Sequence, residues 1–145
     1  MKKLILSSTL MVLLLGMVGC SGSSSSGASL NMTGTWMIYP HSTSTAVVFN
    51  NFQAVLLQSG SSVNSTSVVR NAPPGTVACS TGPITVTGSV AGTTFNGILR
   101  SNNYQASFSM SGTSTSLSGT FTINITSGPC AYAGTVVGNL TMTKG

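Results

Sequence analysis

The feature that most constrains the fold is a repeated alternation of apolar residues with Thr, Ser and other small or polar residues. Successive side chains of a β-strand point to opposite faces, so this alternation predicts strands with one buried and one solvated face. Helical periodicity of 3.6 residues is absent after residue 20. The runs that we expect to form strands are 35–39, 46–58, 63–69, 83–90, 93–100, 104–110, 117–126 and 133–143.

These short runs, separated by turns rich in Gly, Ser, Asn and Pro, predict an all-β antiparallel meander of about eight strands. The pattern also assigns faces. The side chains expected to share one apolar face within each of three late strands are Tyr104, Ala106, Phe108 and Met110; Leu117, Gly119, Phe121, Ile123 and Ile125; and Val136, Gly138, Leu140 and Met142. Closure into a small barrel would remove exposed edges, which matters in a chain with few charged residues to protect them. An open two-sheet sandwich is the alternative.

The charge composition excludes several classes of function. The 145 residues include no Asp or Glu and only five Lys or Arg. Without carboxylates, the chain cannot build the paired acids of glycosidases, a Ser-His-Asp triad or a calcium-type oxygen site. Three scattered cations beyond the N-terminus do not form the basic patch that nucleic acids require. We therefore expect a non-catalytic protein without a metal, cofactor or nucleic-acid partner.

The N-terminus reads as an export signal. Lys2 and Lys3 precede an apolar segment, residues 4–18, that is too short to span a membrane and has the length of a signal-peptide core. Its end, Met17-Val18-Gly19-Cys20, resembles the lipobox of bacterial lipoproteins. That resemblance implies removal of residues 1–19 and acylation of Cys20, which becomes the membrane anchor. Residues 20–29 then form the lipidated cysteine and a flexible Gly/Ser linker, and residues 30–145 form the barrel domain.

The residue after Cys20 bears on location. Some bacteria read an Asp there as an inner-membrane retention signal, and this chain has Ser21. We therefore expect a lipid-anchored envelope protein, in the outer membrane if the host has one. An ordinary secretory signal and a retained N-terminal helix are the alternatives.

Lipidation of Cys20 leaves Cys79 and Cys130 as a pair. Exported proteins fold in oxidising compartments, so the pair predicts a disulfide. It would close a loop of about 50 residues and stabilise the fold by about 4 kcal/mol in the chain-entropy model. Two buried free thiols are the alternative. Metal binding by this pair is disfavoured because His41 is the only histidine.

Two further resemblances concern the folded part. Met32-Thr33-Gly34-Thr35-Trp36 resembles the start of lipocalin-like barrels, which implies that Trp36 closes one barrel end with Lys144 packed on it by cation–π contact. A plain core tryptophan is the alternative. Much of residues 51–140 resembles small, uncharacterised Ser/Thr/Gly-rich lipoproteins of soil bacteria. The runs that carry this resemblance are LLQSGSSVNST, ITVTGSVAGTTFNGIL, SLSGTFTI and SGPCAYAGTVVGNL. The family implies a mid-chain cysteine paired with one in the last hairpin.

Three hypotheses for function follow. The first is a lipid-anchored protein with a structural or interaction role, whose hydroxyl-rich faces contact an envelope protein or a polysaccharide. The second is a carrier for a small apolar ligand, with a lining of Phe95, Ile98, Tyr104, Phe108 and Phe121. The third is a protease inhibitor that uses the loop at residues 71–82. His41, which we place in a loop, could form a Ser-His dyad, but a solvated side chain is the main interpretation. Arg70 or Arg100 could bind an anion, but solvated side chains are again the main interpretation.

Overall fold

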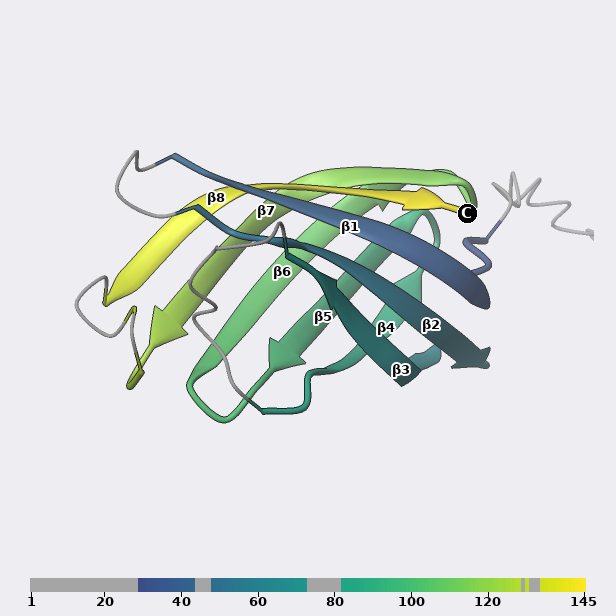
Figure 1. Ribbon diagram of the computed structural model, residues 1–145. Coiled ribbons are helices and arrows are strands. Elements are labelled where there is room, and N and C mark those ends of the chain that lie inside the picture. The colour runs from purple at the N-terminus through teal and green to yellow at the C-terminus, as the bar shows by residue number, and fades with distance from the viewer. Residues whose placement is uncertain (1–28, 44–47, 73–81, 129, 131–133) are drawn as a thin grey trace, which may run out of the picture.

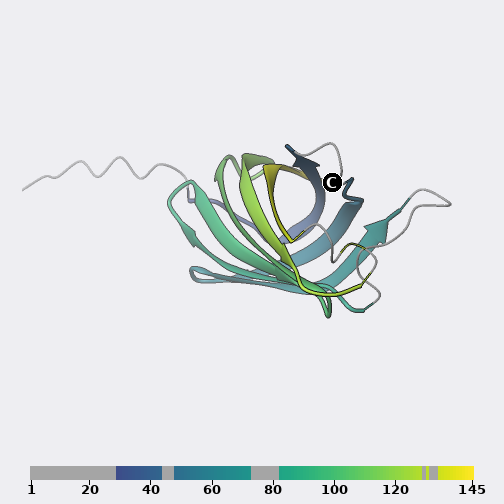
Figure 2. The same ribbon diagram turned by 90° about the vertical axis from the view of Figure 1, so that its left-hand side faces the viewer.

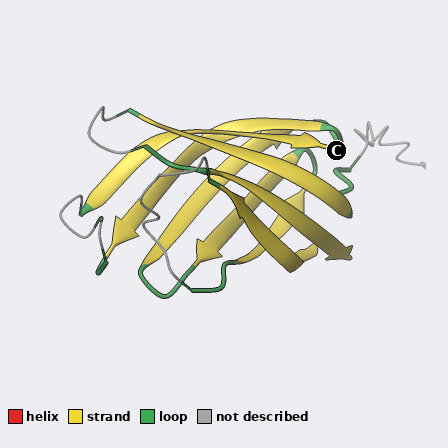
Figure 3. Ribbon diagram, in the orientation of Figure 1, coloured by secondary structure: helices red, strands yellow, loops and turns green. Residues whose placement is uncertain are grey.

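In the computed structural model, which describes residues 29–43, 48–72, 82–128, 130 and 134–145, the chain forms one closed antiparallel barrel (Figure 1). The eight strands follow one another around the barrel in sequence order, and the described residues contain no helix (Figure 3). The strands are β1 (Gly34–Ser42), β2 (Asn51–Ser59), β3 (Ser62–Asn71), β4 (Thr85–Ala91), β5 (Thr94–Arg100), β6 (Tyr104–Gly112), β7 (Ser116–Ile125) and β8 (Thr135–Lys144). The predicted all-β meander is confirmed, and it closes as a barrel rather than a sandwich.

Pairing of the first strand with the last closes the barrel, from Trp36 opposite Lys144 to Ser42 opposite Gly138. The two barrel ends differ. At the end that we call the tryptophan end, β1 begins, β8 ends, and short turns join β2 to β3 and β4 to β5. At the opposite end, the mouth, β1 ends and β8 begins. Figure 2 views the barrel from the mouth side.

The interior follows the predicted alternation. On β6, β7 and β8 every residue assigned to the apolar face is buried except Gly119, which is half-buried. Two phenylalanine rings fill the middle of the barrel by lying over glycines that are their partners on the next strand. A Cβ on Gly97 would meet the ring of Phe108, and a Cβ on Gly138 would meet the ring of Phe121. The glycines therefore make room for large side chains that leave little empty space.

The first strand is longer than predicted and continues through Pro40. We expected a strand over residues 35–39, whereas β1 continues through Pro40 and His41 to Ser42. Pairing with β2 ends at Ile38 opposite Phe52, so the rest of β1 pairs only with β8. Proline lacks an N–H and is tolerated on a strand edge of this kind. His41 is consequently an exposed strand residue, and its predicted placement in a loop is wrong.

A β-bulge at Thr66 changes the direction of β3. Val55 lies opposite Ser67 and Leu56 lies opposite Ser65, so Thr66 is an extra residue between the two pairs. Before the bulge, Val63 and Ser65 face inward; after it, Val68 and Arg70 do. Bulges bend a strand and re-aim its side chains. Beyond the bulge β3 leaves β4, since the register partners of β3 and β4 extend only from Ser62 to Asn64.

Candidate ligand site at the mouth of the barrel

The tryptophan end is plugged by side chains. Trp36 is fully buried, and its Nε1 donates a hydrogen bond of 2.8 Å to the carbonyl oxygen of Met32. The Nζ atom of Lys144 lies 5.6 Å from the ring centroid, a cation–π contact, and donates to the carbonyl of Asn31 at 3.4 Å. Leu30 and Met32 are buried at the same end. The structure thus places Trp36 and Lys144 as the lipocalin-like start implied.

The backbone conformation and the close approach of Lys144 explain why position 34 is a glycine. Gly34 has a φ of +133°, in a region that other residues rarely adopt. A Cβ there would lie 2.8 Å from Cε of Lys144. Gly34 therefore lets the lysine stem cross the start of β1 and reach the Trp36 ring.

An apolar cavity of about 40 Å³ lies inside the barrel toward the mouth. Its lining residues are Ile38, Pro40, Phe49, Phe52, Leu99, Tyr104, Ala106, Phe108, Phe121, Ile123, Leu140 and Met142. Sites for drug-sized ligands enclose about 300–1,000 Å³, whereas one water needs about 10–15 Å³. The cavity therefore has room for a short alkyl group and none for a bulky ligand, because side chains fill most of the barrel.

The structure brings together three of the five residues predicted to line a cavity. Tyr104, Phe108 and Phe121 line it. Phe95 is buried outside the lining, with its ring 5.3 Å from that of Phe108 in an edge-to-face contact. The prediction for Ile98 is wrong, because this residue lies on the outer face between the inward-facing Gly97 and Leu99. Strict alternation from Phe95 would have selected Leu99 instead.

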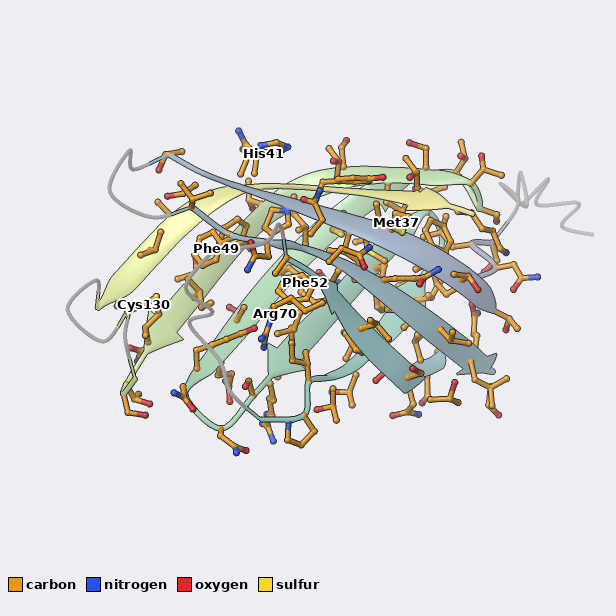
Figure 4. The ribbon with its side chains drawn as sticks, in the orientation of Figure 1. Met37, His41, Phe49, Phe52, Arg70 and Cys130 are labelled. Atoms are coloured by element: carbon orange, nitrogen blue, oxygen red, sulfur yellow. The ribbon has the colours of Figure 1, made fainter. Side chains whose placement is uncertain are left out.

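Sequence reasoning missed the residues that the early strands supply. Phe52 lies on β2, and Phe49 precedes it, outside any strand. The Phe49 ring stands edge-to-face against Phe121 with centroids 5.4 Å apart. The sequence predicts a single strand over residues 46–58. That prediction does not distinguish Phe52, which lies on β2, from Phe49, which lies before the strand. Figure 4 shows Phe49 toward the mouth and Phe52 nearer the middle of the barrel.

Two polar side chains are associated with the cavity: Tyr104 lines it, and Arg70 influences Tyr104 electrostatically. Tyr104, at the start of β6, is only 7 % exposed. Burial raises the pKa of its phenol from 10.0 to about 12, against the opposing influence of the Arg70 charge. Arg70 is half-buried and lies opposite Phe52 in the β2–β3 register (Figure 4). The mouth thus combines an apolar interior with a guanidinium and a neutral phenol.

A second groove, which is polar, lies on the outer surface near the start of β6 and the end of β7. Its lining residues are Arg100, Ser101, Asn102, Tyr104, Gln105, Ser107, Thr122, Asn124 and Thr126. All of these side chains carry hydroxyl, amide or guanidinium groups. Such groups donate and accept hydrogen bonds at a face that carries no negative charge. The predicted anion-binding candidate Arg100 lies here, exposed at the end of β5.

Of the remaining predicted residues, some lie in the core and others lie outside the part of the chain that the structure describes. Cys20 and Cys79 lie outside the described residues, whereas Cys130 is 9 % exposed and belongs to the core. The signal segment and linker, and most of the loop at residues 71–82, also lie outside them. Within the described ranges, no group of three His, Cys, Asp or Glu side chains is placed to hold a metal ion.

The fold and cavity define a small antiparallel meander barrel with one plugged end and an apolar mouth. Comparison with protein-family models, with curated proteins and with solved structures found no significant match. Among the described residues, no helix is long and apolar enough to cross a membrane.

Proposed function

We propose that this chain is a lipid-anchored cell-envelope protein that acts by non-catalytic binding, with its outer hydroxyl-rich face as the contact surface for a polysaccharide. The observation that carries this proposal is the polar groove on β6 and β7. The lipobox-like end of the N-terminal segment supports the anchor, and the absence of Asp and Glu supports a role other than acid–base catalysis.

The outer face has a regular array of uncharged hydrogen-bonding groups. Ser107 lies opposite Thr122 across β6 and β7, and Thr120 lies opposite both Ser109 and Asn139. Hydroxyl groups donate and accept at once, as do the hydroxyls of a sugar chain. A surface of this kind matches a neutral glycan along its length without a charge requirement.

Binding to insoluble envelope polysaccharide tests the surface. A Ser107→Ala/Thr122→Val double variant removes two hydroxyls from the groove while keeping side-chain shape, and we expect several-fold weaker co-sedimentation. A Thr85→Val/Ser89→Ala variant on the outer face of β4 is the matched control and should bind as the wild type does. Equal binding by all three proteins would refute the groove as the contact surface.

Intact-mass analysis of protein purified from its native membrane tests the anchor and the proposed Cys79–Cys130 disulfide. Cys130 is buried, which fits both the disulfide and the alternative of a buried free thiol, so the state of the cysteines must be measured. We expect a mass that begins at Cys20 with acyl groups added, and alkylation of the other two cysteines only after reduction. An unacylated mass would refute the anchor, and alkylation without reduction would refute the disulfide.

The apolar mouth favours a second candidate function, the binding of a small ligand with a short alkyl tail. Its support is the cavity, which is open toward the mouth and is lined by apolar side chains. Filling the space with Ala106→Leu should abolish calorimetric binding of hexanamide, a neutral probe. An outward Ser107→Leu variant on the same strand is the control. No binding of the probe to the wild type would refute this function.

A further inference from the structure

We propose that the mouth binds a short-chain monocarboxylate, with the Arg70 guanidinium paired to the carboxylate, the Tyr104 hydroxyl as a second donor and the tail in the apolar cavity. This inference rests on the second candidate function, and it adds the chemistry of the ligand head group.

The first argument is the direction of Arg70. Without the extra residue at Thr66, the alternation of β3 would place Arg70 on the outer face, together with Asn64. The bulge instead turns Arg70 to the side of Phe52, a cavity-lining residue. The bulge at Thr66 thus brings the cationic side chain of Arg70 to the apolar side of the wall. Bulges commonly redirect side chains in this way.

The second argument is that the chain has no acid to neutralise Arg70. The sequence contains no Asp or Glu, so no side chain in it supplies a carboxylate. Gly145 lies at the tryptophan end, where its N–H donates to the carbonyl of Thr35. A partly buried guanidinium is costly unless a charged partner satisfies it. The anion that fits Arg70 must therefore come from outside the chain.

The third argument is the pairing of head and tail. A guanidinium binds a carboxylate through two parallel N–H···O hydrogen bonds. Tyr104 lies on the cavity wall and is within the electrostatic influence of Arg70, and burial keeps its phenol protonated as a donor. The ligand that satisfies both features has a carboxylate at one end and a short apolar tail at the other.

Calorimetry on the full chain with hexanoate and hexanamide at neutral pH tests the proposal, because the two ligands share a tail and differ in charge. We expect wild-type protein to bind hexanoate at least about tenfold more tightly, the difference of a charge-assisted hydrogen bond. Arg70→Gln should remove this preference while hexanamide binding persists, and Arg70→Lys should restore part of it. Lys144→Gln, which removes a cation at the opposite, tryptophan end of the barrel, is the control.

The outcomes separate the two levels of the proposal. Equal affinity of wild-type protein for the two ligands would overturn the carboxylate inference and leave the apolar site intact. Binding of neither would overturn both. Loss of the preference in Lys144→Gln but not in Arg70→Gln would also overturn it. The melting temperature of ligand-free Arg70→Gln is a second readout: we expect no loss, because the guanidinium has no carboxylate partner in the chain, and a marked loss would indicate a structural role instead.

Discussion

At the scale of single residues, Tyr104 links stability to pH. Burial raises the pKa of its phenol from 10.0 to about 12, so above pH 10 the unfolded chain loses a proton that the folded protein retains. The stability that depends on the neutral phenol is complete below pH 10 and is lost as the pH rises toward 12, which lowers the free energy of unfolding by about 3 kcal/mol in total. We expect Tyr104→Phe to remove this alkaline loss, measured as the pH dependence of urea-unfolding free energy.

The matched control is Tyr39→Phe, at a half-buried position on β1. It should retain the steep loss between pH 10 and 12, since Tyr104 remains. If the unfolding free energy of wild type and of Tyr104→Phe fell in the same way above pH 10, the phenol of Tyr104 would have the same pKa in the folded and unfolded states, and the prediction would be wrong.

At the scale of elements, β3 and β4 are joined beyond their short pairing by a side chain. Val86 is fully buried, and its backbone N–H donates a hydrogen bond of 2.9 Å to Oγ of Ser65, the last inward residue before the bulge. Removing this acceptor leaves a buried donor unsatisfied, which costs about 1–3 kcal/mol. We expect Ser65→Ala to lower the free energy of unfolding by that amount in urea titrations. Ser107→Ala, on the outer face of β6, should change it by less than about 0.5 kcal/mol.

The same elements show what the sequence could predict. On β6, β7 and β8 every second residue is apolar or Gly, so alternation alone identified both strands and faces. The Gly-x-Trp start located the plugged end. Thr66 carries no such signal, because a bulge depends on pairing with β2 and not on the local sequence. The inward direction of Arg70, and with it the polar edge of the mouth, therefore could not be predicted.

At the scale of the whole molecule, the barrel wall is unevenly joined. Register partners between β6 and β7 extend along the full strands, from Tyr104 to Gly112. In contrast, β3 has register partners on β4 only as far as Asn64, whereas β2 stays paired with β1 as far as Phe52, one residue from its mouth end. Among the described residues, the mouth half of β3 therefore pairs with β2 alone. This half of β3 carries Arg70, so the least supported part of the wall bears one residue of the candidate site.

This arrangement predicts where the barrel opens first. Local opening requires the least energy where few backbone hydrogen bonds must break. We expect amides in the mouth half of β3, from Ser67 to Asn71, to exchange with deuterium faster than those of β7, measured by mass spectrometry under native conditions. Hexanoate should slow exchange there and leave β7 unchanged, because a carboxylate on Arg70 stabilises the hairpin against the wall. Uniform exchange along β3 and β7 would show that the barrel opens only as a unit, and that the divergence at the mouth carries no energetic weakness.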